Sequence, residues 1–198
     1  MFLKKLYEPL ERAIEESVLE NTTDVQKKLI PQIKSGNDVL CLNEEGGTGT
    51  TTALVITTIN KLKEAYKDVP RAMIVVPSQA IGEKIEEMFA IYGKYTNLRV
   101  HTAYDTRLIE DQRDKIYFGT DVVIGTLTQI NKLFSISGIN VGKIQLMAID
   151  DADQIAKDAA LSPIERLYQC LPKCQRIIIA KKNTNNIDRI VENNMYVF

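Results

Sequence analysis

The chain has 198 residues, a net charge of −1, and 44% hydrophobic and 26% charged side chains. This is the balance of an ordinary globular protein, and the length allows one α/β domain with a sizeable core. The near-zero charge excludes a polycation, so any nucleic-acid binding needs a local basic patch. No apolar run reaches transmembrane length, and we expect no membrane partner.

The few cysteine and histidine side chains exclude further kinds of site. Cys41, Cys170 and Cys174 fit a reducing compartment, so we expect a cytoplasmic protein with core or surface thiols rather than a zinc site. His101 is the only histidine and is interpreted as a structural residue of a strand. It cannot anchor a Ser/His/Asp triad.

Helical and strand patterns alternate along the chain. Two amphipathic helices are predicted first, over residues 3–19 and from cap candidates at 21–23 to about 34. The predicted strands cover residues 38–42, 71–76, 98–102, 121–125, 146–149, 176–180 and 195–198. Five helices are predicted between these strands. The first ends near residue 66, the second follows Pro77-Ser78, and the other three cover residues 106–118, 126–134 and 162–171.

The central strands are continuous apolar runs, which is typical of a parallel sheet covered on both faces. We therefore predict the α/β class, as a three-layer α/β/α sandwich with a mainly parallel sheet. Strands 38–42 and 146–149 are expected at its centre. One domain is expected to span residues 1–198, with residues 1–37 forming a helical region packed on it.

A glycine loop follows the first predicted strand, in the sequence DVLCLNEEGGTGTTTA. Such a loop can turn backbone N–H groups toward an anion, and the following helix adds the positive end of its dipole. The P-loop pattern requires a lysine directly after the last glycine. Thr50 occupies that position, and Glu44 occupies the first, where a small residue is usual. The loop therefore has the geometry of an NTP site without its main cation.

An acidic run, Asp150–Asp153, follows the predicted strand 146–149. Strand ends of a parallel sheet share one edge, so the glycine loop and this run can face the same ligand. In Walker B sites one carboxylate holds Mg²⁺ and the next acid orients the attacking water. Asp150 and Asp151 fit these two roles by residue type.

Taken in order, these motifs resemble the first RecA-like domain of a DEAD-box RNA helicase of superfamily 2, over nearly the whole chain. The nucleotide loop corresponds to EEGGTGTT at 44–51, and the motif that names the family to DDAD at 150–153. The remaining matches are TTDVQ at 22–26, PSQAIG at 77–82, TLTQ at 126–129 and AKK at 180–182.

The resemblance implies a RecA-like, P-loop NTPase fold and a set of site residues. ATP or ADP with Mg²⁺ is the implied cofactor, and RNA and a second RecA-like domain or protein partner are the implied partners. Gln26 would read adenine, and Phe2, with Tyr7 as the alternative, would stack on the base. The implied residues are Phe2, Gln26, Gly46, Gly47, Thr48, Gly49, Thr50 and Thr51 for the nucleotide; Asp150 and Thr51 for Mg²⁺; Asp151 for catalysis; and Pro77, Ser78, Gln79, Thr126 and Gln129 for RNA.

Most departures from the family pattern remove positive charge. Thr50 replaces the phosphate-binding lysine, Gln79 and Gln129 replace arginines, and Glu44 adds a negative charge. Asp151 is one methylene shorter than the glutamate of the family. We therefore expect a DEAD-box-like module that is catalytically attenuated or inactive and binds RNA weakly or binds a protein partner.

Two alternatives stay open at this point. The chain could be a fragment of a working ATP-dependent RNA helicase that needs a second RecA-like domain. It could instead be a structural or protein-interaction module that binds no nucleotide.

Overall fold

The computed structural model describes residues 6–17, 22–45, 47–191 and 195–197. The helices are α1 (Glu8–Glu15), α2 (Asp24–Lys34), α3 (Thr50–Leu62), α4 (Gln79–Tyr92), α5 (Ile109–Tyr117), α6 (Leu127–Ser135), the 3-10 helix η1 (Val141–Lys143), α7 (Ala152–Ile155), α8 (Asp158–Cys170) and α9 (Asn185–Ile190). The strands are β1 (Val39–Leu42), β2 (Ala72–Val76), β3 (Val100–Ala103), β4 (Val122–Thr126), β5 (Leu146–Ile149), β6 (Gln175–Ala180) and β7 (Tyr196–Val197).

The seven strands form one sheet in the order β3-β4-β2-β5-β6-β1-β7, and every neighbouring pair is parallel. The predicted α/β class with a parallel sheet is confirmed. β5 lies at the centre as expected, but the central position predicted for the strand 38–42 is wrong. β1 is sixth in the order, between β6 and β7. A continuous apolar run indicates that both faces of the sheet are covered at that strand, but it does not indicate where the strand lies in the strand order.

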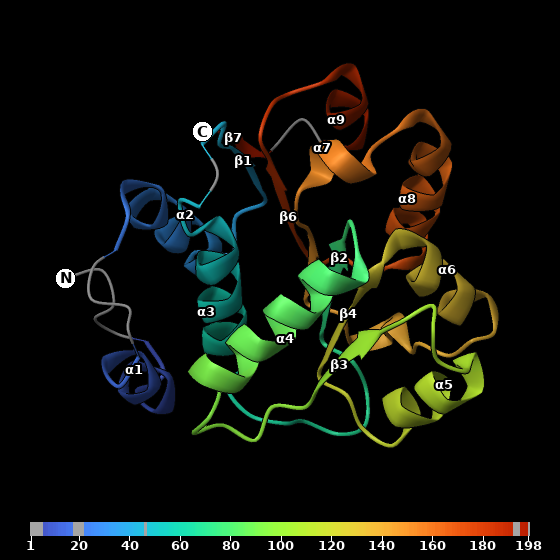
Figure 1. Cartoon of the computed structure of the whole chain (residues 1–198), viewed down its shortest axis with the longest axis horizontal. Coiled ribbons are helices and arrows are strands. Elements are labelled where there is room, and N and C mark those ends of the chain that lie inside the picture. Colours follow the sequence, from blue (N-terminus) through green and yellow to red (C-terminus); the bar gives the residue numbers. More distant parts are fainter. Residues whose placement is uncertain (1–5, 18–21, 46, 192–194, 198) are drawn as a thin grey trace.

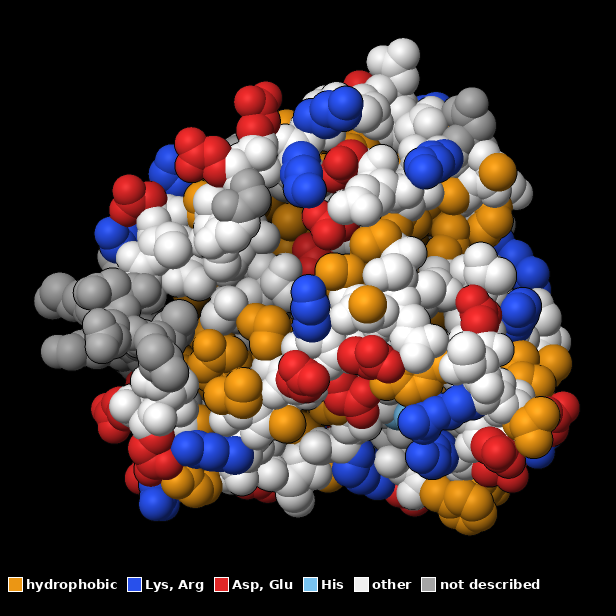
Figure 2. All heavy atoms as spheres, in the orientation of Figure 1, with side chains coloured by type: hydrophobic (Ala, Val, Ile, Leu, Met, Phe, Trp, Pro, Cys, Tyr) orange, Lys and Arg blue, Asp and Glu red, His pale blue; other side chains and the backbone are white. Residues whose placement is uncertain are grey.

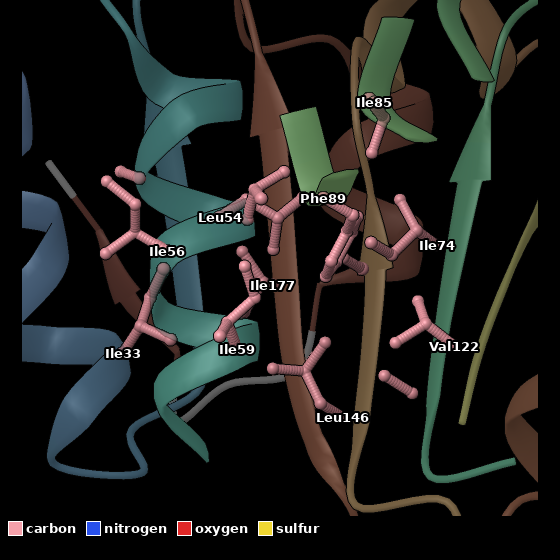
Figure 3. Close-up of a cluster of buried hydrophobic side chains, with 14 of the residues drawn as sticks. Ile33, Leu54, Ile56, Ile59, Ile74, Ile85, Phe89, Val122, Leu146 and Ile177 are labelled. Atoms are coloured by element: carbon pink, nitrogen blue, oxygen red, sulfur yellow. The ribbon is translucent and has the colours of Figure 1, made fainter. Parts of the chain in front are cut away.

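Helices cover both faces of the sheet, which gives the three layers (Figure 1). Helices α1–α4 pack into one hydrophobic cluster, and α5–α9 pack into the other. Alternate residues of one strand enter opposite clusters: Ile74 of β2 lies in the first, while Met73 and Val75 lie in the second. Figure 3 shows the first cluster, in which Ile59 of α3 and Phe89 of α4 face Leu146 and Ile177 of the sheet.

Several element boundaries differ from the sequence prediction. α3 ends at Leu62 rather than near residue 66, because the positive φ of Lys63 (61°) is incompatible with a continuing α-helix. α1 covers only Glu8–Glu15. α8 begins at Asp158, earlier than predicted, and includes Pro163. The short helices α7 and α9 were not predicted, since four and six residues carry too little periodicity to be recognised.

A buried ionic cluster joins the amino ends of β2, β3 and β4. Asp121 is fully buried and accepts hydrogen bonds from Arg71 (Nη2–Oδ1 2.7 Å) and Arg99 (Nε–Oδ2 2.9 Å). Arg71 also donates to the carbonyl of Leu62 at the end of α3 (3.1 Å). The cluster therefore fixes three strand starts and one helix end, at the sheet edge opposite the glycine loop.

The histidine and the cysteines have structural rather than site positions in this fold. His101 is 7% exposed on β3, and its Nε2 has no hydrogen-bond partner among the described residues. Burial lowers the pKa of His101, and the nearby Lys115 lowers it further. Cys41 is buried, and none of the three cysteines forms a disulfide. Within the described residues, no helix is both long and apolar enough to cross a membrane.

Candidate nucleotide site

The glycine loop joins the carboxyl end of β1 to the start of α3. Gly47 and Gly49 have φ values of 78° and 80°, a backbone region that L side chains rarely adopt. Asn43 secures the loop: its backbone N–H donates to the Ala180 carbonyl (2.8 Å), and its Nδ2 donates to the Glu45 carbonyl (2.7 Å) and to the Thr48 hydroxyl. The loop is therefore tied to the ends of both β1 and β6.

Helix α2 is joined to this loop through Gln26. The Gln26 Oε1 accepts from the Thr23 N–H (3.1 Å), and the Thr23 Oγ1 accepts from the Gln26 N–H, which completes a capping box. The Gln26 Nε2 donates to the Gly49 carbonyl (3.1 Å), and the Thr23 hydroxyl donates to the Thr48 carbonyl (2.6 Å). Gln26 is only 2% exposed, so reading a base requires the surface around it to open. One amide N–H and one lone pair remain for that contact.

The close approach of Gln26 makes Gly49 sensitive to any side chain. A Cβ added there would lie 2.2 Å from the Gln26 Nε2. We expect Gly49→Ala to lower the free energy of unfolding by about 1–3 kcal/mol, through the positive φ and a displaced buried amide. Chemical unfolding followed by circular dichroism measures this. Gly47→Ala is the matched control, because its Cβ meets nothing within 4 Å and only the cost of the positive φ applies. If both variants lose the same free energy of unfolding, the contact of Gln26 with Gly49 does not contribute to stability.

Thr51 and Asp150 bring the two sides of the site together. The Thr51 Oγ1 donates to the Asp150 Oδ2 at 2.8 Å, across 99 positions of sequence. Neighbouring oxygens on an octahedral Mg²⁺, each at 2.0–2.1 Å, lie about 2.9 Å apart. The two side chains named for Mg²⁺ from the sequence therefore have a fitting separation. Asp150 is 3% exposed, and burial raises its pKa to about 6.

Asp151 follows in a left-handed conformation (φ 52°) and directly precedes α7. The Asp153 Oδ1 accepts a hydrogen bond from the Lys181 backbone N–H (2.9 Å), which ties this turn to the end of β6. A cavity of about 210 Å³ lies between the turn and the glycine loop, and Gly47, Thr50 and Asp151 contribute to its lining. The glycine loop, Thr51 and the acidic pair thus face one hollow at the carboxyl edge of the sheet.

A larger cavity, of about 740 Å³, lies between α6 and α8 and is lined mainly by apolar side chains. The described residues that line it include no carboxylate and no glycine of the loop. The smaller cavity is the better candidate for a phosphate bound together with Mg²⁺, because backbone donors at a helix start suit the phosphate and the buried carboxylate suits the metal ion.

The residues predicted for RNA lie at two helix starts. The hydroxyls of Ser78 and Thr126 accept hydrogen bonds from the backbone N–H groups of Ile81 (3.4 Å) and Gln129 (3.3 Å), so both residues act as helix caps. The Gln79 side chain donates to Glu83 (3.0 Å) and is partly exposed, and Pro77 is also partly exposed. The Gln129 side chain is 2% exposed, and an RNA contact through it requires a local rearrangement.

Two predicted nucleotide contacts, Phe2 and Gly46, lie outside the described residues. The alternative base-stacking residue, Tyr7, is held elsewhere: its hydroxyl donates to Glu64 (2.6 Å) and its backbone N–H to Asn60 (2.9 Å). Asn60 is ten residues beyond Thr50 on α3, or roughly 15 Å along the helix. Tyr7 is therefore held near the end of α3 that lies away from the glycine loop.

Asn43 had no assigned role at the sequence level, and Lys181 was noted there only within the AKK match at 180–182, as a charge near the site. Asn43 carries the hydrogen bonds that shape the loop, and Lys181 lines the cavity from the end of β6. Asn43 stands directly after an apolar strand, and that position is the only signal that could have pointed to it. Lys181 is 130 positions beyond Thr51, so only the pairing of β6 with β1 brings it close.

The parallel sheet, the glycine loop at a strand end and the opposed carboxylate define a RecA-like fold of the P-loop NTPase class. A family model described as DEAD/DEAH box helicase matches residues 23–181. The chain belongs to this family.

Curated relatives support the same assignment. The chain is 24% identical over 160 residues to the ATP-dependent RNA helicase eIF4A of Yarrowia lipolytica, covering 81% of this chain and 40% of that protein. It is 27% identical over 169 residues to the ATP-dependent RNA helicase DeaD of Mycobacterium tuberculosis, covering 85% and 30%. The chain therefore spans less than half the length of these relatives.

Solved structures share the fold. A DEAD box protein from the hyperthermophile Methanococcus jannaschii superposes with a TM-score of 0.87 at 19% identity, over 96% of this chain and 52% of that one. S. cerevisiae Dbp5 bound to RNA and ADP BeF3 gives a TM-score of 0.84 at 18% identity, over 98% and 50%.

Proposed function

We propose that this chain is a DEAD-box helicase domain that binds ATP or ADP weakly at the glycine loop and hydrolyses ATP negligibly. One observation carries the proposal: Thr51 and Asp150 keep their paired geometry, while Thr50 places a hydroxyl where the phosphate-binding lysine belongs. Backbone N–H groups at the start of α3 can still hold a phosphate.

Magnesium fits this proposal in a defined place. Thr51 and Asp150 would hold the ion, which would neutralise charge on the phosphates. The turn at Asp151 would orient water less well than the family glutamate, because the side chain is one methylene shorter. The chain's own contribution is then to bind and position the nucleotide, and completion of the site falls to a second RecA-like domain or a protein partner.

RNA binding is proposed to be weak. Acidic side chains are interspersed with lysines and arginines over the face shown in Figure 2, without a continuous basic patch. Few cations remain at the motif positions, so few counterions would be released, and we expect a dissociation constant of roughly 10⁻⁴ M at physiological salt. A tight complex with a steep salt dependence, measured by fluorescence anisotropy with single-stranded RNA, would contradict this.

Equilibrium dialysis with labelled ATP and ADP, with and without Mg²⁺, tests the central proposal. We expect saturable binding at high micromolar to millimolar nucleotide, with phosphate release no faster than in buffer alone. Asp150→Asn should remove the Mg²⁺ dependence of binding, because it replaces the charged carboxylate of the Thr51–Asp150 pair with a neutral amide. If neither ATP nor ADP binds at any concentration tested, the structural module is favoured. Rapid ATP hydrolysis would favour the working helicase.

A further inference from the structure

The described residues that line the cavity beside the glycine loop include one positive side chain. Thr50 supplies none, and Glu45, Asp150 and Asp151 contribute negative charge to the lining. Among the described residues that line the cavity, Lys181 is the only lysine or arginine. A phosphate held at the start of α3 would therefore meet a single cation, and that cation comes from β6.

The backbone of Lys181 is fixed on both sides of the cavity. The preceding carbonyl, of Ala180, accepts the Asn43 N–H that begins the loop (2.8 Å), and the Lys181 N–H donates to the Asp153 Oδ1 (2.9 Å). Because β6 pairs with both β1 and β5, this point lies between the loop and the acidic turn. The position of Lys181 thus depends on the same hydrogen bonds that shape the site.

The side chain of Lys181 is available for a ligand. It is exposed, and within the described ranges it forms no ion pair with any carboxylate. Lys182, the next residue, is also exposed but does not line the cavity. Both lysines are exposed and adjacent, and only Lys181 lines the cavity, which makes Lys182 a suitable control for the side chain.

We propose that Lys181 binds the phosphates of a nucleoside di- or triphosphate in place of the missing loop lysine, from the neighbouring strand. The ammonium group can donate three hydrogen bonds to phosphate oxygens. A long flexible side chain at a strand end can approach from the opposite wall of the cavity and still act as a point charge. This inference rests on the proposed nucleotide binding and identifies the residue that makes it selective for phosphate.

The test compares Lys181→Met, Lys181→Arg and Lys182→Met by equilibrium dialysis with ADP, ATP, inorganic tripolyphosphate and adenosine. We expect Lys181→Met to weaken binding of the three phosphate ligands at least tenfold and to leave adenosine unchanged. Lys181→Arg should restore most of the affinity, and Lys182→Met should stay within twofold of the parent. Thermal unfolding should be unchanged in all three variants, because both side chains are exposed.

The same substitution made in a Thr50→Lys variant separates the phosphate contact from other effects. In Thr50→Lys, the Lys181→Met substitution should cost less than it does in the parent, because two cations then share the same phosphates. If Lys181→Met and Lys182→Met behave alike while the parent binds, the Lys181 assignment is wrong and the proposed function stands. If the parent binds neither nucleotide nor tripolyphosphate, both fail together.

Discussion

Replacing Thr50 with lysine and Glu44 with alanine is expected to tighten ATP and ADP binding about 40- to 500-fold, which corresponds to about 2.2–3.7 kcal/mol. The lysine accounts for most of this, since a hydrogen bond to a charged partner contributes about 1.5–3 kcal/mol. Glu44 is exposed, so its carboxylate at about 6 Å from a phosphate costs only about 0.7 kcal/mol in water. Isothermal titration calorimetry with Mg²⁺ measures the change.

The gain depends on the loop already having the right shape. The hydrogen bonds from Asn43 and Gln26 to the loop persist in the double variant, so only the charge changes. Thr52→Lys is the control, because it places the same charge two positions further along α3. Equal affinities for Thr52→Lys and the double variant would point to a general charge effect. No gain in either would show that the loop has lost its shape as well as its cation.

Hydrolysis should remain slow in the double variant even though binding improves. Asp151 keeps its short side chain, and no residue of a second RecA-like domain has been added. Each 1.36 kcal/mol of missing transition-state stabilisation is a factor of ten in rate. A large increase in phosphate release would show that the lysine alone had limited catalysis.

The second large effect concerns the ionic cluster at the opposite edge of the sheet. Asp121→Ala should lower the free energy of unfolding by about 3–5 kcal/mol, because it leaves the guanidinium of Arg71, 6% exposed, without its carboxylate. The same change removes an acceptor for the backbone N–H of Tyr66 (3.0 Å). Urea unfolding followed by circular dichroism is the measurement, since the chain has no tryptophan.

A surface pair provides the control. Asp105 and Lys132 lie 3.4 Å apart with both side chains 55% exposed, and Asp105→Ala should cost no more than about 1 kcal/mol. If Asp121→Ala costs no more than this control, the cluster does not hold the strand starts together.

The cluster also sets a pH dependence with a defined sign. Burial alone would raise the pKa of Asp121, but the hydrogen bonds from Arg99 and Arg71 outweigh it and lower the pKa below the ordinary value of 3.8. A lowered folded-state pKa stabilises the fold above the unfolded pKa, and the stabilisation is lost as the pH falls below about 4. The gap between the parent and Asp121→Ala should therefore narrow in acid. A gap that widens there would contradict the ionic assignment.

The sequence by itself determined the class of fold and the motifs of the site. Apolar runs separated by amphipathic stretches predicted a parallel sheet, because only strands covered on both faces lack alternation. The glycine loop and Asp150 were assigned to one edge because carboxyl ends of parallel strands share it. The missing lysine was visible because its position is defined by neighbouring glycines.

Only the tertiary structure decided the order of the strands and the partners of distant side chains. β1 lies next to the outermost strand, β7, and Gln129 is buried. The residues next to them in the sequence give no indication of either fact. The contact of Gln26 with Gly49 and the entry of Lys181 into the cavity depend on packing across many positions of chain. Sequence periodicity reports the environment of each residue along its own element, whereas strand order and side-chain contacts arise from how separate elements pack together.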